Sequence, residues 1–141
     1  MSAILALDVG TKRIGVAVSD PSRTFALPIG MIERTNLNAD LSRILTYLDE
    51  YQASAIVVGD PITLAGTRGV AAEKMDLFVE HLRKRVLVPI VRIDERMTTA
   101  QVTKSLIAAD VSRKKRRTVV DKLAATLILE TYLARLKYEG Q

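Results

Sequence analysis

The chain has 141 residues, nearly half of them apolar, which suits a single domain (residues 1–141) with its own hydrophobic core. It has no cysteine and one histidine, His81, which excludes disulfides and thiolate sites and disfavours His-rich zinc sites and serine–histidine triads. Acid–base and metal chemistry is left to Asp and Glu, which favour hard cations such as magnesium or manganese. No run approaches membrane-spanning length, so we expect a cytoplasmic protein with no membrane partner.

The net charge of +5 has a local origin. Five of the 21 Lys and Arg residues are consecutive, at positions 113–117, and the other 16 balance the 16 acidic residues. A solvated loop and a phosphate-binding arm are both compatible with such a run. Because five adjacent like charges repel one another, we favour the phosphate-binding arm.

The first two apolar runs predict a β-hairpin. Residues 3–9 are apolar on both faces, as in a strand in the middle of a sheet, and residues 14–19 alternate large with small side chains. The loop between them contains Gly10 and has hairpin length. One face of the second strand carries small residues that would let a helix or a ligand backbone approach closely: Gly15, Ala17 and Ser19.

After a turn at Asp20-Pro21-Ser22, residues 25–32 predict a strand that Pro28 makes irregular or places at an edge. Asn36 or Asn38 can then cap a helix whose apolar residues are Leu41, Ile44, Leu45 and Leu48. A strand over 54–59 and a loop over 60–69 lead to a helix over 70–85, whose apolar stripe is Ala71, Met75, Phe78, Val79 and Leu82. A strand over 88–93 and two helices, capped by Thr98 and Thr118, complete the predicted elements. A strand meander followed by alternating helices and strands predicts an α/β fold, with a five-stranded mixed sheet and helices on both faces.

Three acidic residues stand where the chain could bring them together. Asp8 ends the first strand, Glu95 follows the last strand, and Asp121 lies in the first turn of the last predicted helix. Parallel strands open their carboxyl ends on one edge of a sheet, where ligands bind in open α/β folds. Each acid has a structural alternative: Asp8 could accept backbone amides of the next turn, Glu95 could pair with Arg92 or Arg96, and Asp121 could form a capping box with Thr118. Three neighbouring carboxylates would need divalent cations to neutralise their repulsion.

Four groups of residues, in order along nearly the whole chain, carry a family resemblance: Leu7-Asp8-Val9-Gly10-Thr11-Lys12-Arg13-Ile14-Gly15-Val16-Ala17 with Ser19-Asp20, Val57-Val58-Gly59 with Pro61 and Gly66, Asp94-Glu95-Arg96-Met97-Thr98-Thr99, and Val120-Asp121-Lys122-Leu123-Ala124-Ala125. Together they resemble the YqgF, or RuvX, family of Holliday-junction-resolvase-like proteins. The resemblance implies an RNase H-like fold and a divalent-metal-dependent nuclease. One departure is Asp60, where the family usually has an apolar residue.

By this resemblance, the catalytic and metal-binding carboxylates are Asp8, Glu95 and Asp121, which would hold Mg²⁺ or Mn²⁺ as a two-metal site. Such a site activates water with one ion and stabilises the leaving oxygen with the other, so it needs no histidine. The residues expected to contact nucleic acid are Lys12, Arg13 and Arg96 beside the scissile phosphate, and Lys114, Lys115, Arg116 and Arg117 of the basic run.

The family association implies cleavage at the 5′ end of precursor 16S ribosomal RNA. Similarity to RuvC implies four-way DNA junctions as the alternative, for which a symmetric homodimer would be suited. A phosphotransferase of the actin and sugar-kinase superfamily would share Asp8-x-Gly10-Thr11, but needs a second domain for which this chain has no room. A catalytically inactive nucleic-acid-binding module also remains open, although the presence of all three carboxylates argues against it.

Overall fold

The computed structural model describes residues 2–60, 69–94 and 113–139, and for residues 113–122 it describes the backbone. The expected loop residues 61–68, Glu95, Arg96 and the helix predicted to begin at Thr98 lie outside these ranges. The described elements are β1 (Ile4–Val9), β2 (Arg13–Ser19), β3 (Ala26–Glu33), α1 (Leu37–Tyr51), β4 (Ala55–Asp60), α2 (Val70–Arg83), β5 (Ile90–Asp94) and α4 (Arg113–Tyr138). Among them, no helix is both long and apolar enough to cross a membrane.

The five strands form one mixed sheet in the order β3-β2-β1-β4-β5. The first three strands are an antiparallel meander, whereas β1, β4 and β5 run parallel to one another, as the sequence predicts. Strand β1 occupies the predicted central position. Strand β3 lies at an edge, and its pairing with β2 shifts register next to Pro28 because proline cannot donate a ladder hydrogen bond.

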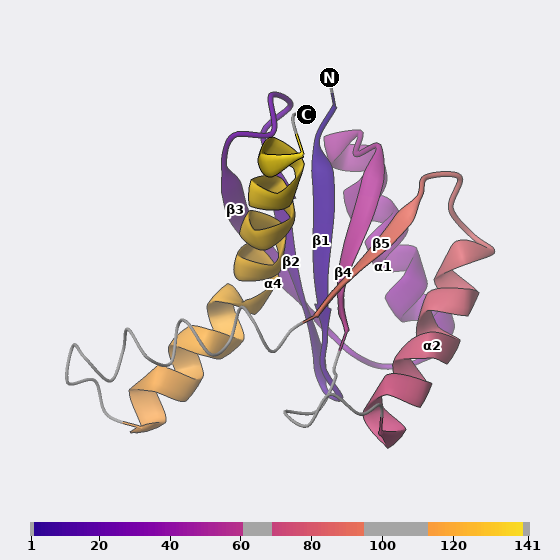
Figure 1. The fold of residues 1–141 in the computed structure, drawn as a ribbon. Coiled ribbons are helices and arrows are strands. Elements are labelled where there is room, and N and C mark those ends of the chain that lie inside the picture. The colour runs from indigo at the N-terminus through magenta and orange to yellow at the C-terminus, as the bar shows by residue number, and fades with distance from the viewer. Residues whose placement is uncertain (1, 61–68, 95–112, 140–141) are drawn as a thin grey trace.

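Helices cover both faces of the sheet, so this prediction is confirmed (Figure 1). On one face, Leu5 and Leu7 of β1 pack in a core with the buried sides of α1 and α2. On the other face, Ile4 and Ala6 pack against α4, including Ile128 and Leu129. The small face of β2 admits this helix: a Cβ placed on Gly15 would lie 3.6 Å from the Cβ of Ala125.

The start of α4 corrects the sequence prediction. The helix begins at Arg113, so the basic run forms its first turns, Thr118 is not an N-cap, and Asp121 is not in the first turn. Lysine and arginine are good helix formers, and their intrinsic propensity extends the helix through the charged run.

Smaller differences concern β4 and α2. Asp60, predicted to begin a loop, is the last residue of β4 and is buried. Helix α2 ends at Arg83 rather than at Arg85, and its buried side contains Ala72 in place of the predicted Ala71. The Asn36 side chain caps α1 by accepting the Ala39 amide at 2.9 Å, and His81 is exposed, as predicted.

Candidate functional site at the carboxyl end of the central strand

Asp8 lies one residue before the end of β1 and is partly exposed. Within the described parts of the chain, no group donates a hydrogen bond to its carboxylate. The amide of Gly10 in the following turn is occupied elsewhere, because it donates to the Arg13 carbonyl at 2.8 Å. The structural alternative for Asp8, a strand-end acid bonded to the next turn, is therefore not what these residues form.

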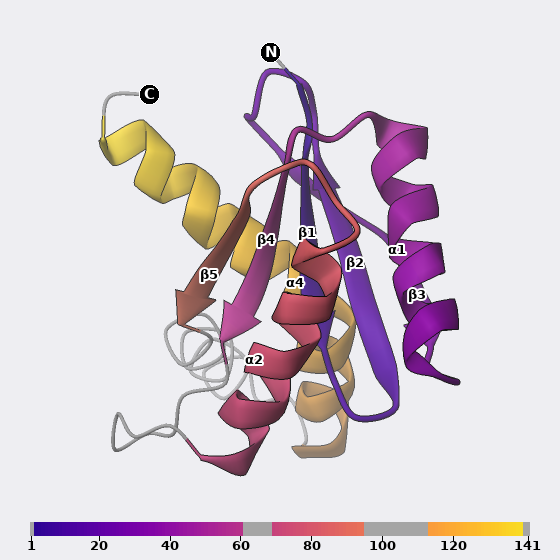
Figure 2. The ribbon, with the colours of Figure 1, turned by 90° about the vertical axis from the view of Figure 1, so that its right-hand side faces the viewer.

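Asp8 stands on the α4 side of the sheet. It pairs with Gly15, and a Cβ placed on Gly15 would lie 3.7 Å from the Asp8 Cβ and 3.6 Å from the Ala125 Cβ. Asp121 precedes Ala125 by four positions, which is about one helical turn toward the start of α4. Both pictures place the start of α4 at the end of the sheet that carries the β1–β2 loop (Figures 1 and 2).

The parallel strands β1, β4 and β5 all open toward this same edge, as predicted. Strand β5 ends at Asp94, immediately before Glu95, which lies outside the described residues together with Arg96. Within the described ranges, no group of three His, Cys, Asp or Glu residues could hold a metal ion. The assignment of Asp8, Glu95 and Asp121 as a metal-binding set stays a prediction.

Two of the predicted phosphate-contacting residues flank the β1–β2 loop. Lys12 is exposed, and Arg13 at the start of β2 forms an ion pair with Glu33 of β3, with Nε and Oε1 2.9 Å apart. Both partners are more than half exposed, at 57% and 69%. Exposed pairs of this kind contribute about 0–1 kcal/mol, so Arg13 can exchange Glu33 for a phosphate at little cost.

Arg34 is a site residue that sequence reasoning missed. Its Nη1 donates to the Gly10 carbonyl at 2.8 Å, and its backbone amide donates to the Lys12 carbonyl at 2.9 Å. Its guanidinium also reaches Asp40 at 3.3 Å and lies over the ring of Phe78. Arg34 therefore holds the β1–β2 loop in place, and this loop carries Lys12 and follows the strand that carries Asp8.

Asp40 is the signal that could have indicated this contact. It lies in the first turn of α1, four positions before Ile44, and so shares the apolar stripe of the helix. The side chain is only 2% exposed, and it accepts both the Arg34 guanidinium and the Thr35 amide. Since burying a carboxylate is costly unless it is paired and hydrogen-bonded, an acid on an apolar stripe predicts a basic partner.

Asp60, the departure from the family pattern, also has a basic partner. Arg92 of β5 donates to Asp60 Oδ1 at 2.9 Å and to Asp76 Oδ1 of α2 at 2.6 Å. These contacts tie the ends of β4 and β5 to α2. Arg92, one of the two arginines suggested as a partner for Glu95, thus binds two other carboxylates, and Arg96, the second, lies outside the described residues.

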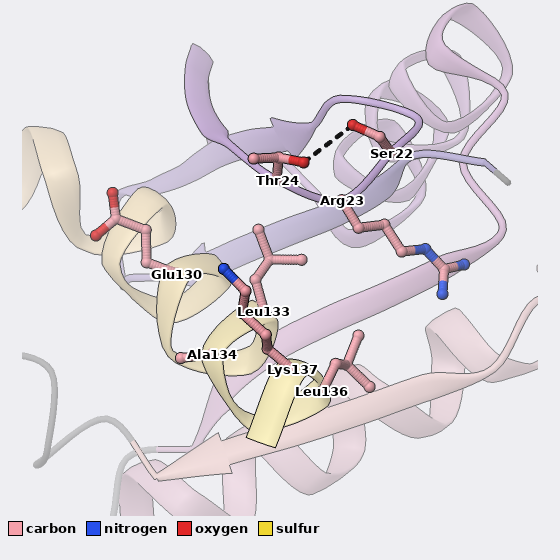
Figure 3. A pocket seen from close by; sticks show the side chains of 8 residues that line it. All are labelled: Ser22, Arg23, Thr24, Glu130, Leu133, Ala134, Leu136 and Lys137. Atoms are coloured by element: carbon pink, nitrogen blue, oxygen red, sulfur yellow. Dashed lines mark hydrogen bonds between the residues drawn. The ribbon is translucent and has the colours of Figure 1, made fainter. Parts of the chain in front are cut away.

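A cavity of about 430 Å³ lies at the opposite end of the sheet, between the turn after β2 and the second half of α4 (Figure 3). Its lining includes Ser22 and Thr24 from the turn and Glu130, Leu133 and Lys137 from α4. Figure 3 shows the Arg23 side chain extending away from α4. The cavity is separate from the edge that carries Asp8.

The strand order, the helices on both faces and the acid at the end of the central strand define an RNase H-like protein. Solved structures agree: Thermus thermophilus RuvC in complex with a Holliday junction substrate superposes with a TM-score of 0.58 at 14% identity, over 96% of each chain. The fowlpox virus Holliday junction resolvase superposes with a TM-score of 0.53 at 15% identity, over 94% of this chain and 99% of the other. At these identities the likeness establishes the fold.

The family model RuvX, described as Holliday junction resolvase, matches residues 2–135, and the chain belongs to this family of nucleases. A relative from Desulforudis audaxviator is 47% identical over 130 residues, covering 92% of each chain. A relative from Thermoanaerobacter pseudethanolicus is 47% identical over 131 residues, covering 92% of this chain and 94% of the other. Both relatives bear the name "Putative pre-16S rRNA nuclease".

Proposed function

We propose that the chain forms a single-domain, divalent-metal-dependent endonuclease that processes the 5′ end of precursor 16S ribosomal RNA in the cytoplasm. The relatives at 47% identity support the substrate through their name. The observation that carries the chemistry is Asp8, a carboxylate at the carboxyl end of the central strand to which no described residue donates a hydrogen bond. A strand-end carboxylate that accepts nothing from the described residues is available to a cation.

The donor chemistry fits magnesium or manganese. Asp8, Glu95 and Asp121 offer carboxylate oxygens, which hard divalent cations prefer, and the chain has no cysteine to favour a softer metal. When bound, such ions polarise a phosphodiester and lower the pKa of an attacking water. The chain's own part is to hold the substrate phosphate: Lys12, Arg13 and Arg96 would place positive charge beside it and offset the charge that develops on its oxygens.

The basic run supports phosphate binding through its place in α4. It begins α4, whose first four backbone N–H groups lack helical partners and whose macrodipole is positive at this end. An exposed cation near this positive helix end destabilises the helix by roughly 0.3–1 kcal/mol. A phosphate bound there would be attracted by both the cations and the helix end, so the net interaction would become favourable. We therefore assign Lys114, Lys115, Arg116 and Arg117 to contacts with the nucleic-acid backbone.

The experiment compares end-labelled precursor 16S RNA with a four-way DNA junction, each with magnesium, with manganese and with a chelator. We expect cleavage at the 5′ end of the RNA that is lost on chelation. Cleavage that persists in the chelator would overturn the metal-dependent mechanism, and binding without cleavage of either substrate would identify an inactive nucleic-acid-binding module.

Junction resolution is the second candidate, because the matching family model carries that description. Cutting two strands symmetrically would require two active sites and hence a homodimer. Paired nicks in the junction, together with a dimer in sedimentation, would establish this alternative.

A further inference from the structure

A second group of cations gathers where the β1–β2 loop, the end of β3 and the first half of α1 meet. We name Lys12, Arg13, Arg34 and Arg43 the basic corner. Two of its arginines contact the same residue: Arg13 pairs with the Glu33 carboxylate at 2.9 Å, and Arg43 of α1 donates to the Glu33 carbonyl at 3.1 Å. Arg34, the next residue, binds the carbonyls of Gly10 and Lys12.

The charges of the basic corner are only partly neutralised. Asp40 is buried and occupied by Arg34 and the Thr35 amide, so it presents almost nothing to solvent. Glu33 is the exposed acid, and its carboxylate faces Arg13. In the described parts of the chain, no carboxylate forms an ion pair with Lys12 or Arg43. The corner therefore presents more positive than negative charge to solvent.

The basic corner is also held in place before any ligand arrives. Arg43 is anchored through Nη1 to a neutral carbonyl, which leaves its charge uncompensated and its other N–H groups able to meet a second acceptor. The planar guanidinium suits phosphate oxygens, and an anchored side chain loses less entropy on binding. Figure 2 shows the β1–β2 loop and the start of α1 at the same end of the sheet.

We propose that the basic corner carries the nucleic-acid-binding surface beyond Lys12 and Arg13, with Arg43 contacting phosphate outside the cleavage site. This inference rests on the proposed function, since it extends the path of the same substrate. Helix α1 lies on one face of the sheet and α4 on the other. The basic corner and the basic run of α4 would thus hold the substrate from two sides of Asp8.

The test measures binding of a short single-stranded RNA in the presence of a chelator, over a range of salt concentrations. Each phosphate contact to a single strand contributes a slope of about −0.7 to the plot of log affinity against log salt. We expect Arg43→Gln to flatten the slope by about 0.7, and Lys12→Gln with Arg43→Gln to flatten it by about 1.4. Lys137→Gln is the matched control, because it removes one exposed cation at the far end of α4.

An unchanged slope for Arg43→Gln, or an equal change for Lys137→Gln, would overturn the proposal. Arg43→Lys keeps the charge and should restore most of the slope. If it did not, the hydrogen bond to Glu33 would matter rather than the charge, and the proposal would fall. Because the chelator prevents metal-dependent cleavage, these binding results are independent of the nuclease test. If Arg43→Gln alters RNA binding but the native protein does not cleave, only the proposal for the basic corner is supported. If the native protein cleaves but Arg43→Gln binds RNA normally, only the proposed nuclease function is supported.

Discussion

Two aspartates at opposite ends of the sheet show how the same side chain serves different purposes. Asp20 follows β2, and its carboxylate accepts the backbone amides of Thr24 and Phe25, both at 2.7 Å, and the Ser22 hydroxyl. Asp8 lies one residue before the end of the neighbouring antiparallel strand, and no described residue donates to it. The oxygens of Asp20 are occupied by the turn, whereas those of Asp8 accept no hydrogen bond from a described residue, as the proposed metal site requires.

The basic residues repeat this contrast. Arg23, in the Asp20 turn, donates to the Ser2 carbonyl at 3.1 Å and to the Ser54 hydroxyl at 3.2 Å, so it ties the turn to two other segments. Lys12, in the loop beside Asp8, is exposed and forms no ion pair within the described ranges. The turn at one end of the sheet is therefore internally satisfied, whereas at the other end Asp8 and Lys12 have no such partners among the described residues.

Replacing Asp8 should have the largest effect. We expect Asp8→Asn to abolish cleavage while the metal-free protein stays folded and becomes equally or more stable, because the proposed site would set Asp8 against Glu95 and Asp121 and the substitution would remove that repulsion. Thermal melts with and without manganese, together with cleavage assays, measure this. A variant that still cuts and still gains full stability from manganese would refute the assignment of Asp8.

Asp121→Asn should also lower activity by orders of magnitude. Loss of a true N-cap would cost about 0.5–2 kcal/mol, but α4 begins at Arg113, so Asp121 does not cap it. We therefore expect little change in the free energy of unfolding. Kinetics and a denaturant melt on one preparation decide between the two roles, because a stable, fully active variant would leave Asp121 without a part in the site.

The basic run should have a smaller and graded effect. Replacing Lys114, Lys115, Arg116 and Arg117 with Gln should flatten the plot of log affinity against log salt by about two to three units, as one or two of the four need not touch the ligand. Weakening should be similar across sequences, since phosphate contacts do not read bases. An unchanged slope in the quadruple variant would mean that these residues serve only to solvate the helix start.

The sequence predicts the sheet well because its information is local. Apolar runs bounded by turns locate the five strands to within about two residues, and Asn36 and the leucine spacing locate α1. The central position of β1 follows from its apolar character on both faces. The convergence of β1 and β5 on one edge follows from their parallel direction.

The missed features depend on partners distant in the chain. Arg34 fixes the β1–β2 loop through the carbonyl of Gly10, and Asp60 is buried because Arg92 stands on the neighbouring strand. The apolar stripe of α1 indicates a basic partner for Asp40, but it does not indicate that this partner also binds Gly10, and nothing within β4 indicates Arg92. The start of α4 differs from the prediction for another reason: Thr118 has the chemistry of a cap, but the helical propensity of the preceding Lys and Arg residues extends the helix back to Arg113.

Asp20 should give the smallest effect, and one confined to low pH. The Phe25 amide, the Ser22 hydroxyl and the Thr24 amide hold the pKa of Asp20 below its usual 3.8. A carboxylate whose pKa is lowered on folding stabilises the protein above its unfolded pKa, and this contribution is lost as pH falls through the folded value. Asp20→Asn should therefore be slightly less stable than the native chain at neutral pH and should lose less stability below about pH 4.

Urea melts from neutral to acidic pH measure this, with Ser22→Ala as the matched variant that removes one donor and keeps the charge. Cleavage at neutral pH should be unchanged in both variants; a large loss of activity in Asp20→Asn would show that the two ends of the sheet are not independent, and would break the contrast between Asp8 and Asp20.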